Sequence, residues 1–200
     1  MPHWYVSSAR GALFDVDVPA GFHYRDDFVT MVEEASLAEE IARLEFSTFA
    51  MRGVVARRRV AFFGRSYDSR TAFTPEFPPF LMPLRDRVAV WAHVDPEAFA
   101  MALINEYSPG APIGWHRDAP PYGVVAGISL LSSCRMKFRP YVRPGSQAAG
   151  QGPKRTATHE IALQRRSAYL MTGESRNAYE HHIPAVTALR YSITFRTVRS

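Results

Sequence analysis

A histidine and an aspartate stand two residues apart in the middle of this chain, at His116 and Asp118. On an extended strand, side chains two residues apart project from the same face, so an imidazole and a carboxylate can grip one ion together. One more imidazole would complete a facial set of two nitrogen ligands and one carboxylate. That set suits non-haem Fe(II) and leaves coordination positions open for a co-substrate and O2. The spacing therefore indicates oxygenase chemistry.

Two candidates for the second imidazole stand next to each other near the C-terminus, in Glu180-His181-His182-Ile183-Pro184. Neighbouring residues of an extended segment point to opposite faces, so only one of the two can join the pair. From the residues alone, either His181 or His182 could supply the second imidazole ligand. A lone His-x-Asp pair commonly means no more than a solvated strand end, so the metal hypothesis depends on these histidines and on the arginines that follow.

Two arginines follow on a segment with the period of a strand. Between Arg190 and Arg196, apolar residues alternate with polar ones, which places both arginines on the polar face. Two guanidiniums on one face are hard to bury without anions to meet them. A small dicarboxylate would satisfy both, because the arginine fork matches the two oxygens of a carboxylate. The alternative is a pair of edge-strand arginines that face water.

Taken together, these motifs resemble the AlkB-type Fe(II)/2-oxoglutarate-dependent dioxygenases. The matching elements are Asn105-x-Tyr107-x-Pro109-Gly110, His116-x-Asp118, His181 with Ile183-Pro184, and the run from Arg190 to Arg196. The resemblance implies Fe(II) ligands at His116, Asp118 and His181. It also implies 2-oxoglutarate contacts from Asn105, Tyr107, Arg190 and Arg196. O2 and 2-oxoglutarate would be the co-substrates, and an N-methyl group would leave as formaldehyde beside succinate and CO2.

The elements that must position these residues follow from the hydrophobic period. An amphipathic helix capped by Thr30 is expected over Val32–Phe46, and a second helix within Leu81–His93. From Met101 onward, short alternating segments between Pro and Gly turn signals predict strands. These are residues 101–107, 124–131, 135–141, 158–163, 168–172 and 190–197.

Many short strands favour a sandwich or barrel. With the resemblance, this becomes a double-stranded β-helix, or jelly roll, in a mainly β chain with flanking helices (α+β). The 200 residues, of which 46% are hydrophobic, predict one domain over residues 1–200. We expect an N-terminal helical and substrate-lid part over about residues 1–100 and the jelly-roll core over about 101–200.

Cysteine usage and hydropathy indicate in which cellular compartment the protein is expected. The single Cys134 excludes an internal disulfide, and the N-terminus lacks the charged and apolar regions of a signal peptide. Apolar runs stay far below transmembrane length. We therefore expect a cytoplasmic monomer without a membrane partner.

Charge and aromatic residues suggest a polyanionic partner. The net charge is +5, and residues 134–200 carry 12 Lys and Arg against 3 Asp and Glu. Cations mixed with aromatic rings, as in single-strand nucleic-acid binders, occur at Arg57-Arg58-Arg59 with Tyr67. Arg135, Lys137 and Arg139 share one strand face, and Tyr122 could stack on an extruded base. Ordinary solvated loops and surface charge remain the alternative for each of these candidates.

Three functions fit the sequence. The leading hypothesis is oxidative N-demethylation of alkylated DNA or RNA, as in nucleic-acid repair. The second is a hydroxylase or demethylase of protein side chains on the same iron centre. The third is a basic β-domain that binds nucleic acid around a vestigial metal site, which the intact triad and both arginines disfavour.

Overall fold

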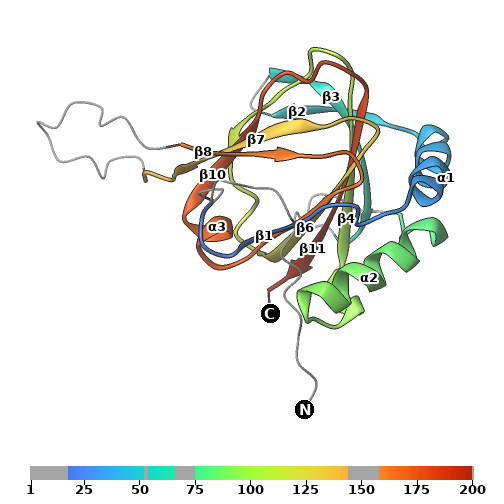
Figure 1. Cartoon of the computed structure of the whole chain (residues 1–200), viewed down its shortest axis with the longest axis horizontal. Helices are drawn as coiled ribbons and strands as arrows, with labels where there is room; N and C mark the ends of the chain where they lie inside the picture. Colours follow the sequence, from blue (N-terminus) through green and yellow to red (C-terminus); the bar gives the residue numbers. More distant parts are fainter. Residues whose placement is uncertain (1–17, 52–53, 66–74, 144–157, 200) are drawn as a thin grey trace, which may run out of the picture.

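Two antiparallel sheets face each other in the computed structural model, which describes residues 18–51, 54–65, 75–143 and 158–199 (Figure 1). The larger sheet has seven strands in the order β1-β9-β6-β11-β4-β3-β2, and the smaller has four in the order β5-β10-β7-β8. The strands of the larger sheet are β1 Phe22–Arg25, β2 Ser47–Met51, β3 Val54–Gly64, β4 Met101–Tyr107, β6 Tyr122–Leu130, β9 Ala168–Met171 and β11 Arg190–Val198. Those of the smaller sheet are β5 Ile113–His116, β7 Cys134–Pro140, β8 His159–Leu163 and β10 Tyr179–Ile183.

Apart from the β7–β8 pair, which stays within the smaller sheet, the eight strands β4 to β11 alternate between the two sheets in the manner of a jelly roll. This confirms the predicted double-stranded β-helix. The three earlier strands extend the larger sheet, with β1 pairing with β9 and β3 pairing with β4. The first hundred residues, expected to be helical, therefore also supply three strands to the larger sheet.

The two longest helices cover the outer face of the larger sheet (Figure 1). Helix α1 spans Met31–Ala42 and begins at a capping box, in which Thr30 and Glu33 each bond the backbone N–H of the other. It buries Leu37 and Ile41 against the sheet. The remaining helical elements are α2 Met82–Ala92, α3 Gly173–Asn177, and the 3-10 turns η1 Pro79–Leu81 and η2 Pro96–Ala98.

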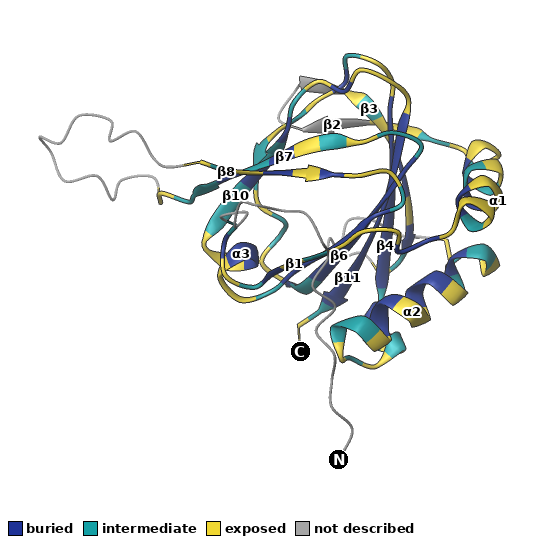
Figure 2. Cartoon of the chain, in the orientation of Figure 1, coloured by how far each residue is buried: buried dark blue, intermediate teal, exposed yellow. Residues whose placement is uncertain are grey.

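Alternate side chains of β11 point to opposite faces of the larger sheet. Tyr191, Ile193 and Phe195 belong to the core between the larger sheet and the helices. Ser192 and Thr194 point the other way, into the space between the two sheets. Both sets are buried, as Figure 2 shows for the central strands of the larger sheet. A polar set buried between two sheets marks the place to look for a site.

Candidate iron and 2-oxoglutarate site

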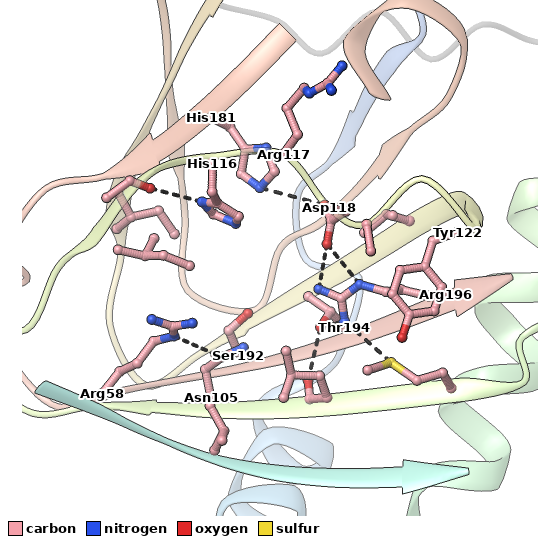
Figure 3. Close-up of a pocket in the computed structure, with 18 of the residues that line it drawn as sticks. Arg58, Asn105, His116, Arg117, Asp118, Tyr122, His181, Ser192, Thr194 and Arg196 are labelled. Carbon is pink, nitrogen blue, oxygen red and sulfur yellow. Dashed lines mark hydrogen bonds and ion pairs between the residues drawn. The ribbon is translucent and has the colours of Figure 1, made fainter. Parts of the chain in front are cut away.

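The smaller sheet brings the two candidate histidine ligands face to face. His116 ends β5, His181 lies in the middle of β10, and the two are register partners. Their ring centroids are 4.2 Å apart. The Nε2 of His181 lies 3.7 Å from Oδ2 of Asp118, so all three side chains converge (Figure 3).

The carboxylate reaches this cluster from a loop rather than from a strand. β5 stops at His116, so strand alternation, the basis of the sequence argument, does not explain where Asp118 points. The loop after Asp118 is instead fixed by Arg176 of α3. Its Nη2 donates to the carbonyls of Ala119 and Tyr122, at 2.6 and 2.9 Å. Sequence reasoning missed Arg176, because a lone arginine in a short helix carries no periodic signal.

The two imidazoles are neutral, which is the form that binds a metal. The carbonyl of Gly114 accepts a hydrogen bond from Nδ1 of His116 at 2.9 Å, which leaves Nε2 of that ring as the candidate ligand atom. Burial lowers the pKa of His116. Burial, and then the electrostatic interaction with the adjacent ring of His116, lower the pKa of His181 to about 3.

The Asp118 carboxylate is ionised although it is buried. Burial by itself would raise its pKa, but the guanidinium charge of Arg196, with smaller electrostatic contributions from the neighbouring side chains, outweighs that effect and lowers it. Arg196 donates to Oδ1 of Asp118 from Nε at 2.8 Å and from Nη2 at 2.7 Å. Within the described parts of the chain, no group of three or more His, Cys, Asp or Glu side chains meets the geometry of a metal site. The donors present nonetheless fit Fe(II), since two neutral imidazoles and one carboxylate are the facial set.

His182 lies on the other face of β10. Its Nδ1 is 2.6 Å from the carbonyl oxygen of Ile113, and its ring centroid is 5.1 Å from that of Trp115. The structure therefore brings His181, and not its neighbour, to the pair at His116 and Asp118.

Arg190 supplies the clearest sign of an anion site. Its side chain is fully buried, with Nη2 donating to Oγ of Ser129 at 2.8 Å and the guanidinium carbon 5.2 Å from the ring centroid of Tyr107. Its Nε and Nη1 have no hydrogen-bond acceptor among the described residues. Buried donors of a charged group are costly to leave unsatisfied, so the guanidinium fits the carboxylate of a ligand such as 2-oxoglutarate.

A cavity of about 300 Å³ lies between the sheets, and Arg190 is not among the described residues that line it. Its wall includes the candidate ligands His116, Asp118 and His181 together with Asn105, Tyr107 and Arg196. Asn105 and Tyr107 share one face of β4, as their spacing predicts. Ser192 and Thr194 also line the cavity and were not singled out from the sequence, although they follow the same alternation on β11.

The Arg57-Arg58-Arg59 run divides between two faces of β3. Arg58 lines the cavity, and its Nε donates to Oδ1 of Asn105 at 3.1 Å. Arg59 faces away and meets both oxygens of Glu106, at 2.7 and 2.9 Å. Arg57 is exposed, and Tyr67 lies outside the described residues.

Tyr122 lines the cavity as a packed part of its wall. The ring is 4% exposed, with the guanidinium carbon of Arg196 5.5 Å from its centroid.

The three cations of β7 share one face as predicted, but each meets a carboxylate. Arg135 and Lys137 both contact Glu160, at 3.0 and 3.1 Å, and Arg139 contacts Glu180 at 2.7 Å. The alternation of exposed Arg135 with buried Met136 and Phe138 bears out the strand pattern. The ion pairs reduce the charge that this face can offer to phosphates.

A jelly roll that presents two histidines, one aspartate and Arg196 toward one cavity, with Arg190 buried beside Tyr107, is the arrangement typical of Fe(II)- and 2-oxoglutarate-dependent dioxygenases. The chain belongs to the 2OG-Fe(II) oxygenase superfamily, whose sequence profile matches residues 43–196. It is an AlkB-like member, which confirms the resemblance, and its cofactor and co-substrates are Fe(II), 2-oxoglutarate and O2.

Two curated proteins are similar in sequence. An alkylated DNA repair protein ALKBH8 homolog of Arabidopsis thaliana is 27% identical over 187 residues, covering 85% of this chain and 52% of that protein. The chain thus spans about half the length of that relative. A probable RNA/DNA demethylase ALKBH6 of Danio rerio is 23% identical over 174 residues, covering 85% of this chain and 72% of that protein.

Two solved structures share the fold. The structure of OsALKBH1 aligns with a TM-score of 0.66 at 14% identity, covering 90% of this chain and all of that chain. A prolyl-4-hydroxylase of Pseudomonas putida aligns with a TM-score of 0.60 at 13% identity, covering 90% of this chain and 94% of the other. At these identities the comparison supports the fold alone. Among the described helices, none combines the length and the apolar composition that a membrane span requires.

Proposed function

We propose that this protein is an oxidative N-demethylase of alkylated DNA or RNA. In this proposal Fe(II) is held by His116, Asp118 and His181. The co-substrate 2-oxoglutarate is held by Asn105, Tyr107, Arg190 and Arg196. We also propose that the protein works as a monomer in the cytoplasm and that it takes part in nucleic-acid repair.

The observation that carries the nucleic-acid substrate is the face of β3 that looks into the cavity. Phe62 stands on this face and keeps 37% of its surface exposed, although it lines a cavity beside a metal-ligand cluster. Arg58 stands on the same face four residues earlier. An aromatic ring and a guanidinium that line one cavity suit a flat base that is taken out of its stack and read by stacking and hydrogen bonds. The names of the two curated relatives, an alkylated DNA repair protein and an RNA/DNA demethylase, support the same substrate class.

The residues of the chain divide the work. The buried donors of Arg190 would bind the far carboxylate of 2-oxoglutarate, and Asn105 and Tyr107 would orient the molecule from β4. Arg196 keeps Asp118 ionised and turned toward the cluster. Bound iron would supply the O2 activation that places one oxygen atom on the methyl carbon and the other in succinate, with CO2 leaving. The hydroxymethyl product then loses formaldehyde and leaves the bare nitrogen.

A substrate panel tests the proposal. The purified protein with Fe(II) and 2-oxoglutarate is offered methylated single-stranded DNA, duplex DNA, RNA and a methylated peptide, and formaldehyde is measured, with His116→Ala as the inactive control. We expect release from nucleic acid and none from the peptide. Turnover of the peptide alone would transfer the function to the protein-modifying alternative.

A further inference from the structure

We propose that Tyr169 is a further binding residue for 2-oxoglutarate, and that its hydroxyl donates a hydrogen bond to the carboxylate on the metal side of that molecule. Neither the sequence motifs nor the resemblance singled out this tyrosine. The inference rests on the co-substrate site of the proposed function and adds one residue to it.

Tyr169 reaches from β9 across the neighbouring strand β6 and lines the cavity. It is the register partner of Gly127, and a Cβ at Gly127 would lie 2.3 Å from Cζ and 2.5 Å from Oη of the ring. The end of the ring therefore occupies the space that a larger side chain at residue 127 would fill. The ring also stacks on Phe22, with the two centroids 5.7 Å apart. These two contacts fix where the hydroxyl lies.

The hydroxyl lies on the side of the cavity that carries the candidate metal ligands. Gly127 is the register partner of Thr194 on β11. Paired positions on neighbouring strands lie about 5 Å apart, so the Tyr169 hydroxyl above Gly127 is close to Thr194. Thr194 stands two residues before Arg196, and Arg196 binds Asp118 (Figure 3). A carboxylate that binds beside the metal ligands would therefore come near the phenol.

The other polar groups of β11 on this side are already bonded within the protein. Arg196 directs Nε and Nη2 to Oδ1 of Asp118. Its Nη1 lies 3.0 Å from Oγ1 of Thr194 and 3.5 Å from Sδ of Met101, which leaves one of its five N–H donors for a ligand. The Thr194 hydroxyl gives its own proton to the carbonyl of Leu103 at 3.0 Å. A buried carboxylate needs more donors than this, because an anion without hydrogen bonds is costly to bury.

Tyr169 can supply the missing donor. Among the residues that the structure describes, none forms a hydrogen bond with its hydroxyl, although the residue is only 6% exposed. Burial, and then the charge of Asp118, raise the pKa of Tyr169, so the hydroxyl keeps its proton. A protonated phenol donates a strong, charge-assisted hydrogen bond to a carboxylate. The phenol thus complements Arg196, whose donors are mostly engaged.

The test measures the binding of 2-oxoglutarate without turnover. Protein loaded with Fe(II) is titrated calorimetrically with 2-oxoglutarate in the absence of O2 and of nucleic acid. Tyr169→Phe keeps the ring and removes only the hydroxyl. We expect its Kd for 2-oxoglutarate to rise about tenfold, since a hydrogen bond to a charged group is lost. The affinity for Fe(II) alone should not change, which separates this variant from one with a damaged metal site.

Tyr24→Phe is the matched control. Tyr24 is the register partner of Tyr169 on β1, but its hydroxyl accepts a hydrogen bond from the backbone N–H of Gln164 at 2.9 Å. It is not among the described residues that line the cavity, so its Kd for 2-oxoglutarate should not change. Gly127→Ala is a second variant, which keeps the hydroxyl but displaces the ring. It should weaken binding as Tyr169→Phe does, and the double variant should lose little more, because both changes act on one contact.

An unchanged Kd in Tyr169→Phe would overturn the inference. So would normal 2-oxoglutarate binding with a raised KM for a methylated strand, because the hydroxyl would then contact the substrate. Arg190→Ala separates these results from failure of the co-substrate site itself. If that variant also keeps its Kd, 2-oxoglutarate binds elsewhere and the proposed site falls with the inference. Weaker 2-oxoglutarate binding in Tyr169→Phe, in a protein that demethylates no strand, would support the inference and overturn the proposed function.

Discussion

Arg196 and Asp118 form a two-donor contact on a single oxygen, with Nε and Nη2 of the arginine 2.8 and 2.7 Å from Oδ1. The last strand is thereby tied to the loop that follows β5. Because Oδ1 is engaged, Oδ2 is the oxygen that faces His181 and is placed to act as a one-oxygen metal ligand. An arginine assigned to the co-substrate thus also orients the carboxylate assigned to the metal.

The first prediction concerns the metal ligands. Alanine at His116, Asp118 or His181 should abolish succinate formation and Fe(II) binding, because two imidazoles and one carboxylate are needed for the facial set. His182→Ala is the matched control from the same strand, and it should keep iron binding. Titration with Fe(II) under anaerobic conditions measures both. Iron binding that survives His181→Ala but is lost in His182→Ala would reverse the assignment.

The second prediction concerns the buried guanidinium. Arg190→Ala removes a charge-assisted contact to a carboxylate, which contributes on the order of 2–3 kcal/mol, so the KM for 2-oxoglutarate should rise roughly a hundredfold. Arg190→Lys should restore only part of the affinity, because an ammonium group cannot make a two-pronged contact. Initial rates against 2-oxoglutarate concentration give the values. An unchanged KM in the alanine variant would place the co-substrate elsewhere.

The alternation of apolar and polar residues along the chain explains why most of the strands could be predicted from the sequence. β4 matches its expected bounds from Met101 to Tyr107, and β11 runs one residue beyond the expected end. The capped start of α1 at Thr30 is also confirmed, because a capping box is a local signal. Local period and local caps depend on neighbours in sequence, which the sequence displays.

The features that escaped prediction depend on residues far apart in the chain. The partners of the β7 cations, Glu160 and Glu180, come from β8 and β10, and no local pattern pairs them. The inward turn of Arg58 depends on the register of β3 against β4. Asp118 reaches the cluster through a loop held by Arg176, and loops carry no period from which a direction can be predicted.

The third prediction treats Arg176 as a positioning residue. Arg176→Met leaves the carbonyls of Ala119 and Tyr122 without their donor, so the loop that carries Asp118 loosens. Fe(II) affinity should fall roughly tenfold to a hundredfold, as for other residues that orient a metal ligand. Excess Fe(II) should restore most of the turnover. A loss that excess iron does not repair, together with a lowered melting temperature, would mean that Arg176 only stabilises the fold.

The last prediction concerns the outer face of β7, if nucleic acid passes over it. Its three cations meet two carboxylates, so we expect the face to present a net charge near +1 to phosphates. A charge of that size contributes about −0.7 to the slope of log affinity against log salt concentration for single strands. Replacing Glu160 and Glu180 together with Gln releases Arg135, Lys137 and Arg139 from their ion pairs. The slope should then steepen by about 1.4 and the affinity at low salt should rise.

Glu97→Gln serves as the control, because Glu97 pairs with Arg85 in the helical layer and should leave the slope unchanged. Fluorescence anisotropy with a labelled oligonucleotide between low and moderate salt measures the slopes. Equal slopes in the wild type and the double variant would mean that nucleic acid does not touch this face, and that its charges only keep the jelly roll soluble.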